Sequence, residues 1–140
     1  MAEYKRLVSR YLDENDIKFT DVKENVIKIA YSGDNLKTIP IFVFFDKDGD
    51  PLVTLRCWEI CNFKYQEARG ILTCNEMNSR YRWVTFYVDD DDDVIAQIDS
   101  YIDEENCGSV VLDLVRRMVN IIDETYPKFM KARWGAEKSN

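Results

Sequence analysis

The feature that most constrains this chain is a pair of apolar segments joined by a short acidic turn. Residues 39–45 are entirely apolar, residues 46–51 read DKDGDP, and a second apolar segment begins at Leu52. Asp and Gly are favoured in tight turns, and Pro51 can begin a strand without removing a ladder hydrogen bond. The sequence therefore predicts an antiparallel hairpin over residues 39–60.

The acidic turn imitates a calcium loop but does not match one. Asp46, Asp48 and Asp50 alternate as the first ligands of an EF-hand loop do, yet glycine occupies the fourth position and Cys57 the twelfth. A second acidic run, the five aspartates of residues 89–93, is interpreted as a solvated turn between strands. A weak cation site shared by both loops stays open if the fold brings the two hairpin ends together.

Hydrophobic periodicity predicts the remaining elements. Apolar residues at helical spacing predict helices over residues 2–15, 63–80 and 109–133. Alternation predicts two strands within residues 18–32 and four more over residues 37–46, 52–61, 82–88 and 94–102. In the second helix, the predicted apolar side contains Tyr65, Ala68, Ile71 and Leu72.

The order of these elements, α-β(4)-α-β(2)-α, predicts an α+β fold. Hairpin-length connections favour a mostly antiparallel sheet packed with helices. Because the chain has 140 residues and no linker-like segment, we expect one domain over residues 1–133 and a loose tail over residues 134–140.

Composition argues against several classes of function. A net charge of −7 without a basic block opposes nucleic-acid binding, and no apolar run is long enough to span a membrane. The four cysteines form no CxxC pair and the chain has no histidine, so we expect reduced thiols, no metal site and no cofactor. No catalytic motif is present, which predicts a non-enzymatic, soluble, cytoplasmic protein without a membrane or nucleic-acid partner.

The predicted sheet has two apolar faces. Ile39, Ile41 and Val43 alternate with Phe42 and Phe44, so one helical layer cannot cover them all. Either the second helix or a strongly twisted sheet covers the aromatic positions, or they bind another chain, since aromatic residues and arginine are enriched at interfaces. The candidate protein interface consists of Phe42, Phe44, Trp58, Trp83 and Tyr87.

Three segments resemble the YbjN family of bacterial sensory transduction regulators. They are IFVFFDKDGD (residues 41–50), LTCNEMN followed by RWVTFYVD (residues 72–78 and 82–89), and the last helix with its Tyr126-Pro127 pair. The resemblance extends over roughly residues 4–131. It implies a cytoplasmic, non-enzymatic α+β domain similar to type III secretion chaperones, often dimeric, acting through protein partners. Asn75 and Asn78 match paired asparagines of the family, and we expect them to end the helix and to bond the next strand.

Two functions are consistent with these features. The first is a protein-interaction module, chaperone-like or regulatory, that binds a protein partner or itself, as a homodimer, through the aromatic sheet face. The alternative is a sensor domain that responds to a small ligand or a cation through its acidic hairpin loops.

Overall fold

Within residues 3–135, nine elements build the fold in the predicted order, so the α-β(4)-α-β(2)-α prediction is confirmed. The structure is a computed structural model that describes residues 3–135. The elements are α1 (Glu3–Glu14), β1 (Thr20–Lys23), β2 (Val26–Tyr31), β3 (Ile39–Phe45), β4 (Leu52–Cys57), α2 (Glu67–Arg80), β5 (Thr85–Val88), β6 (Val94–Tyr101) and α3 (Cys107–Trp134).

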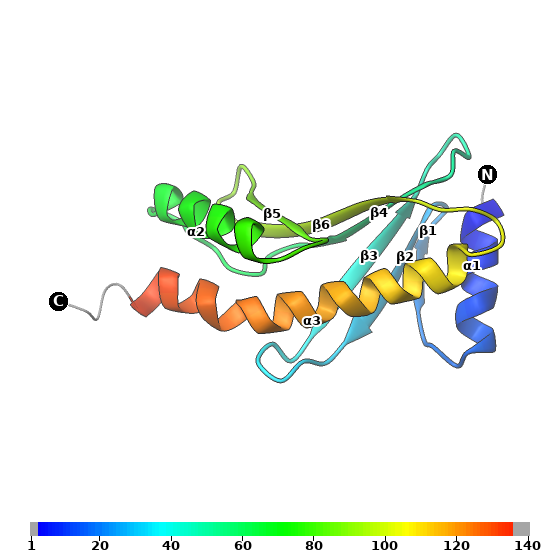
Figure 1. The fold of residues 1–140 in the computed structure, drawn as a ribbon, viewed down its shortest axis with the longest axis horizontal. Coiled ribbons are helices and arrows are strands. Elements are labelled where there is room, and N and C mark those ends of the chain that lie inside the picture. The colour runs from blue at the N-terminus through cyan, green and yellow to red at the C-terminus, as the bar shows by residue number, and fades with distance from the viewer. Residues whose placement is uncertain (1–2, 136–140) are drawn as a thin grey trace.

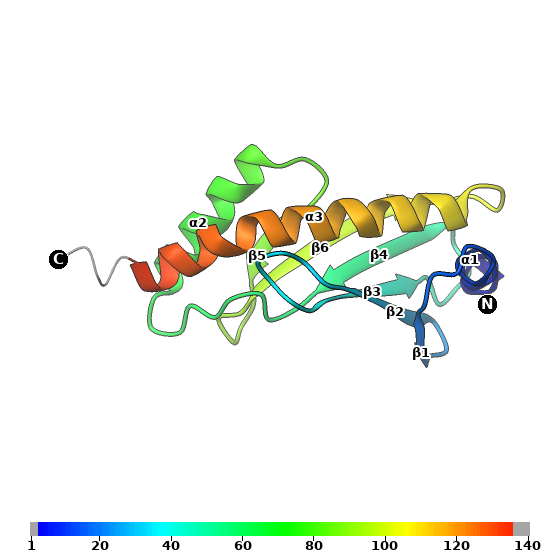
Figure 2. The same cartoon turned by 90° about the horizontal axis from the view of Figure 1, so that it is seen from below.

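The six strands form one antiparallel sheet in the order β1-β2-β3-β4-β6-β5. Figure 1 shows α3 running along the sheet, and Figure 2 shows α2 and α3 on the same side of it. The helix α1 lies at one end, beside the N-terminal half of α3, and contributes Val8 and Leu12 to the core. The arrangement is therefore α+β, with helices gathered on one face.

The core lies between this helical layer and one face of the sheet. Ile27, Val43, Leu55 and Ile98 pair across four adjacent strands, and all are buried. Alternate residues along each strand share a face, so the Ile and Val positions of β3 lie on the helix-covered face. The intervening positions must point to the opposite face.

The outer edge of β5 is closed by a side chain of α2. Asn78 Nδ2 donates to the Phe86 carbonyl at 3.0 Å, and Asn78 Oδ1 accepts the Phe86 N–H at 2.7 Å. The amide thus replaces a neighbouring strand at this edge, where unpaired backbone groups would invite another chain. The predicted bonding of Asn78 to the next strand is confirmed, whereas Asn75 makes no such bond in the described part of the chain. The helix continues past both residues to Arg80, so the prediction that they end it is wrong.

The long helix α3 also holds the loop between β2 and β3. Pro127 lies inside α3 and has no N–H to donate to the Asp123 carbonyl. That carbonyl accepts a hydrogen bond from Asn35 Nδ2 at 3.1 Å instead. The Asp123 carboxylate accepts the backbone N–H groups of Asp34, Asn35 and Leu36 at 3.0, 2.8 and 2.9 Å. The backbone carbonyl and the side-chain carboxylate of Asp123 therefore both bind the loop between β2 and β3.

Several predicted boundaries differ from the structure. The second helix begins at Glu67 and not at residue 63, and the fourth strand ends at Cys57 and not at residue 61. The last helix begins at Cys107, with Asn106 as its N-cap, and Ser109 lies within its first turn. The strand predicted from residue 82 begins at Thr85, because Trp83 has a φ of 82° and interrupts the extended backbone. The predicted tail starts at Trp134, which is still part of α3, and residues 136–140 lie outside the described residues.

The predicted burial of the second helix is wrong. Ile71 and Leu72 are 59% and 69% exposed, and the buried side of α2 consists of Gly70, Thr73, Cys74 and Met77. Gly70 permits the reversal because it lies directly against Phe63. The helix therefore turns its least bulky side to the core, and two aliphatic side chains face outward.

Candidate interaction surface

One face of the sheet carries no helix within residues 3–135. A row of paired residues crosses five strands on this face: Lys28, Phe42, Arg56, Gln97 and Thr85. None of them is buried, in contrast to the row on the helix-covered face. We call this side of the sheet the open face.

The helix α2 does not cover the open face. It packs on the same side as Phe86, which belongs to the buried core together with Met77 of α2. Tyr87, the next residue along β5, points to the other side of the sheet and is 37% exposed. The predicted alternative in which the second helix covers the aromatic positions is therefore wrong.

Three aromatic rings form a cluster at the centre of the open face. Trp58 packs against Phe42 with ring centroids 5.1 Å apart and an interplanar angle of 70°, and against Phe44 at 5.9 Å and 78°. Such edge-to-face contacts are the favoured geometry between aromatic rings. The three rings bury part of one another, and each of them is half-buried. We call Phe42, Phe44 and Trp58 the aromatic cluster.

Two cations lie over the aromatic cluster. The Arg56 guanidinium is 5.4 Å from the ring centroid of Phe44 and 5.6 Å from that of Trp58. Lys28 Nζ lies 5.9 Å from the centroid of Phe42. These are cation–π distances, and they place positive charge on an apolar surface. The cluster can thus contact an apolar side chain while Arg56 binds a carbonyl or a carboxylate.

Hydrogen bonds connect the cluster to the β5 side of the open face. Gln97 Oε1 accepts from Arg56 Nε at 2.9 Å and from the Tyr87 hydroxyl at 3.0 Å. Gln97 Nε2 donates to Asp99 at 3.0 Å, and Asp99 also accepts from Thr54. The side chains of this network are held in place by one another before any partner binds.

Trp83 lies at the border of this surface and not in the aromatic cluster. Its indole is 51% exposed and stacks against Arg117 of α3, whose guanidinium carbon is 5.3 Å from the ring centroid. It also lines, with Tyr87 and Gln97, a pocket of about 390 Å³. The five predicted interface residues therefore divide into the aromatic cluster, Tyr87 joined to it by hydrogen bonds, and Trp83 at the sheet edge.

The two acidic loops lie at opposite ends of the sheet. Leu52, just after the first loop, pairs with Tyr101 at the end of β6, whereas the second loop precedes Val94 at its start. Seven steps along β6 correspond to about 23 Å. The fold does not bring the two hairpin ends together, so the two acidic loops do not share a cation site. Within residues 3–135, no group of three or more Cys, Asp or Glu side chains is placed to hold a metal ion.

Aspartates within these loops bind their own backbone. Asp46 Oδ2 accepts the N–H groups of Asp48 and Asp50 at 3.0 and 3.1 Å. Asp89 Oδ1 accepts those of Asp91 and Asp93 at 2.9 and 3.0 Å. Such bonds stabilise tight turns. The prediction of structural turns is confirmed for both loops.

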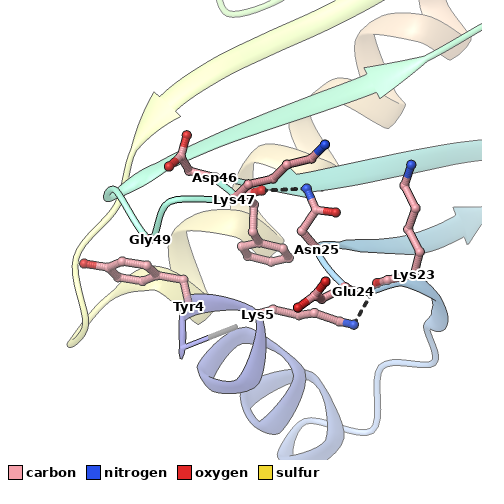
Figure 3. Close-up of a pocket in the computed structure, with 9 residues that line it drawn as sticks. Tyr4, Lys5, Lys23, Glu24, Asn25, Asp46, Lys47 and Gly49 are labelled. Atoms are coloured by element: carbon pink, nitrogen blue, oxygen red, sulfur yellow. Dashed lines mark hydrogen bonds between the residues drawn. The ribbon is translucent and has the colours of Figure 1, made fainter. Parts of the chain in front are cut away.

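A pocket of about 490 Å³ lies where α1 meets the turns that follow β1 and β3 (Figure 3). Three of its polar side chains, those of Lys5, Asn25 and Asp46, bind other groups of the protein. Lys5 Nζ binds Asp21 at 2.8 Å and the Lys23 carbonyl at 2.9 Å, and Asn25 donates to the Phe45 carbonyl at 3.0 Å. The bonds of Lys5 join α1 to β1, and that of Asn25 joins the turn after β1 to the end of β3.

The fold and its surface define a class: an α+β protein whose helices cover one face of an antiparallel sheet and leave an aromatic face open. The chain belongs to the YbjN family, described as "Putative bacterial sensory transduction regulator", which matches residues 5–131. The family resemblance read from the sequence is confirmed. None of the helices in the described part of the chain is long and apolar enough to cross a membrane.

No curated protein matches this chain. A solved structure that is similar is the Yersinia pestis type III secretion chaperone SycH in complex with a stable fragment of YscM2. It is 12% identical, the match covers 84% of this chain and 98% of that chain, and the TM-score is 0.47.

Proposed function

We propose that this protein is a non-enzymatic interaction module, chaperone-like or regulatory, whose open face binds another polypeptide. The polypeptide is a protein partner or a second copy of the chain. The observation that carries the proposal is the aromatic cluster of Phe42, Phe44 and Trp58, centred on a sheet face that none of the helices in residues 3–135 covers. The family description as a regulator supports the same class of function.

The composition of the open face is that of a binding surface. Aromatic residues and arginine are enriched at the centres of protein interfaces, where they contribute much of the binding energy. Arg56 stacks on two rings of the cluster, and Gln97 holds its Nε. A partner that contacts this surface therefore meets side chains that are already ordered, which lowers the entropic cost of binding.

We also propose that the protein acts in the cytoplasm. Its four cysteines are free and buried. Unpaired cysteines are typical of proteins in reducing compartments, where disulfides are rare.

The chain offers a matched set of variants for the test, because its three tryptophans lie in different places. Trp58 belongs to the aromatic cluster, Trp83 borders the open face, and Trp134 stacks on Arg133 at the end of α3. Each is changed to alanine, and circular dichroism confirms the fold. Sedimentation velocity measures self-association, and affinity capture from a lysate followed by mass spectrometry compares the bound proteins.

We expect Trp58→Ala to weaken self-association, or capture of a specific partner, at least tenfold, since a central aromatic residue contributes about 2 kcal/mol or more. Trp83→Ala is expected to have a smaller effect, and Trp134→Ala none. Equal behaviour of the wild type and the folded Trp58→Ala variant in both measurements would contradict the proposal.

A further inference from the structure

A second surface, on the helical side of the molecule, concentrates positive charge. A groove of about 480 Å³ lies between α2 and α3, and four cationic side chains line it: Arg69 and Arg80 from α2, Lys128 and Lys131 from α3. Met77 contributes an apolar contact. The volume is within the range of small-molecule sites, about 300–1,000 Å³.

The charges in this groove are unbalanced. Glu76 is the one acidic residue that lines it, and its carboxylate pairs with Arg80 at 2.7 Å. Within residues 3–135, Arg69, Lys128 and Lys131 form no ion pair. The whole chain has 26 acidic and 19 basic residues and a net charge of −7, so the groove reverses the overall charge of the protein.

Helix dipoles account for only part of this arrangement. Cations stabilise the C-terminal turn of a helix, which explains Arg80 in α2 and Lys131 in α3. Arg69 is the third residue of α2, where the dipole disfavours a cation, and Lys128 lies well before the last turn of α3. The helix dipoles do not stabilise cations at these two positions, yet both add positive charge to the groove.

We propose that the groove between α2 and α3 binds a small phosphorylated molecule with several negative charges. Arginine side chains suit phosphate because their guanidinium groups donate two parallel hydrogen bonds, and lysine adds point charges. Bound phosphates would relieve the mutual repulsion of the four cations. The site lies on the helical side of the sheet and is independent of the interaction proposed for the open face.

The net charge favours a small ligand over an acidic protein. A protein with an acidic surface is repelled by the charge of −7 as it approaches. A small anion within the groove is influenced mostly by charges within about 8 Å, the screening length at physiological ionic strength. Among the residues that line the groove, four are cationic and one, Glu76, is acidic.

The test uses calorimetric titration of the full chain with sodium tripolyphosphate and with ATP, in buffer without divalent cations so that the acidic loops cannot bridge to phosphate. The variant Lys128→Gln/Lys131→Gln removes two groove charges. Lys18→Gln/Lys37→Gln removes two charges from exposed positions outside the groove and serves as the control. An acidic decapeptide of aspartate is titrated in parallel.

We expect tripolyphosphate to bind the wild type and the control equally and the groove variant at least tenfold more weakly, with lower affinity at higher salt. The ligand should also raise the melting temperature of the first two proteins only. Absence of binding up to millimolar concentration, or equal binding by variant and control, overturns the proposal. Binding of the acidic peptide without binding of either phosphate compound also overturns it.

Discussion

Gly70 of α2 lies so close to Phe63 that a β-carbon added to the glycine would be 2.9 Å from both Cβ and Cγ of the phenylalanine. Phe63 is fully buried, so its near atoms cannot move aside easily. Only glycine can bring this side of α2 so close to Phe63. On the same helix, Ile71 and Leu72 face solvent.

We expect Gly70→Ala to lower the free energy of unfolding by about 1 kcal/mol, because overpacking a tight contact costs more than the helix gains. In an open helix position, the same change would raise stability by about 1 kcal/mol. Chemical denaturation measures the difference. Asn75→Ala, at an exposed position of the same helix, is the control, and a stability gain at Gly70 would contradict the tight contact.

Leu72 and Met77 test the orientation of α2 directly. Leu72 is 69% exposed, whereas Met77 is 2% exposed and belongs to the core. Met77→Ala should lower the free energy of unfolding by about 2–5 kcal/mol. Leu72→Ala should change it by no more than about 0.5 kcal/mol. A larger loss of stability for Leu72→Ala than for Met77→Ala would instead support the orientation of α2 that periodicity predicts.

Asn78 should contribute both stability and resistance to aggregation. Asn78→Ala removes two hydrogen bonds to Phe86 and leaves that strand edge unpaired, which should cost about 1–3 kcal/mol. Light scattering should detect self-association of the variant through the uncovered edge of β5. Asn75→Ala is again the control, and equal stability of the two variants would contradict the assigned role.

Asp123 should make stability depend on pH in acid. Hydrogen bonds from the backbone of Leu36, Asn35 and Asp34 hold the pKa of its carboxyl below the usual value, although desolvation acts in the opposite direction. Its stabilising effect is therefore complete above the unfolded pKa of about 3.9 and disappears as the pH falls through the lower folded pKa. Melting temperatures of wild type and Asp123→Asn should differ at pH 7 and converge in strong acid. A constant difference across this range would contradict the effect.

The four thiols should react slowly in the native protein. Burial raises the pKa of Cys57 and Cys74 to about 12 and that of Cys61 to about 11, and it also raises the pKa of Cys107. At pH 8 the reactive thiolate is therefore scarce. A colorimetric disulfide reagent should modify none of them rapidly in the folded chain and all four in denaturant. One fast thiol per native chain would contradict this.

The alternation of residues along the strands was enough to predict the sheet and its two apolar faces. In β3, the positions of Ile41 and Val43 on one side and of Phe42 and Phe44 on the other follow from a period of two, which is a local property. The family resemblance came from segments of the same kind. The hairpin turns were also predictable, because their aspartates bond backbone groups two and four residues away.

Other features required the tertiary structure. Helical spacing in α2 allowed an apolar side containing Ile71 and Leu72, whereas in the structure the side with Gly70 packs against Phe63 and these two residues are exposed. Trp83 and Tyr87 are four residues apart, so alternation along a strand would place them on the same face. The positive φ of Trp83 instead places it at the sheet edge, against Arg117.

The sequence by itself determined the order of the elements, the pairing of the central hairpin and the presence of an aromatic side of the sheet. The tertiary structure decided that the helices cover the opposite side, that the two acidic loops lie apart, and that basic residues of α2 and α3 line one groove. The physical reason is that periodicity reports local geometry. The choice of which apolar surface is covered depends on packing between segments far apart in the chain.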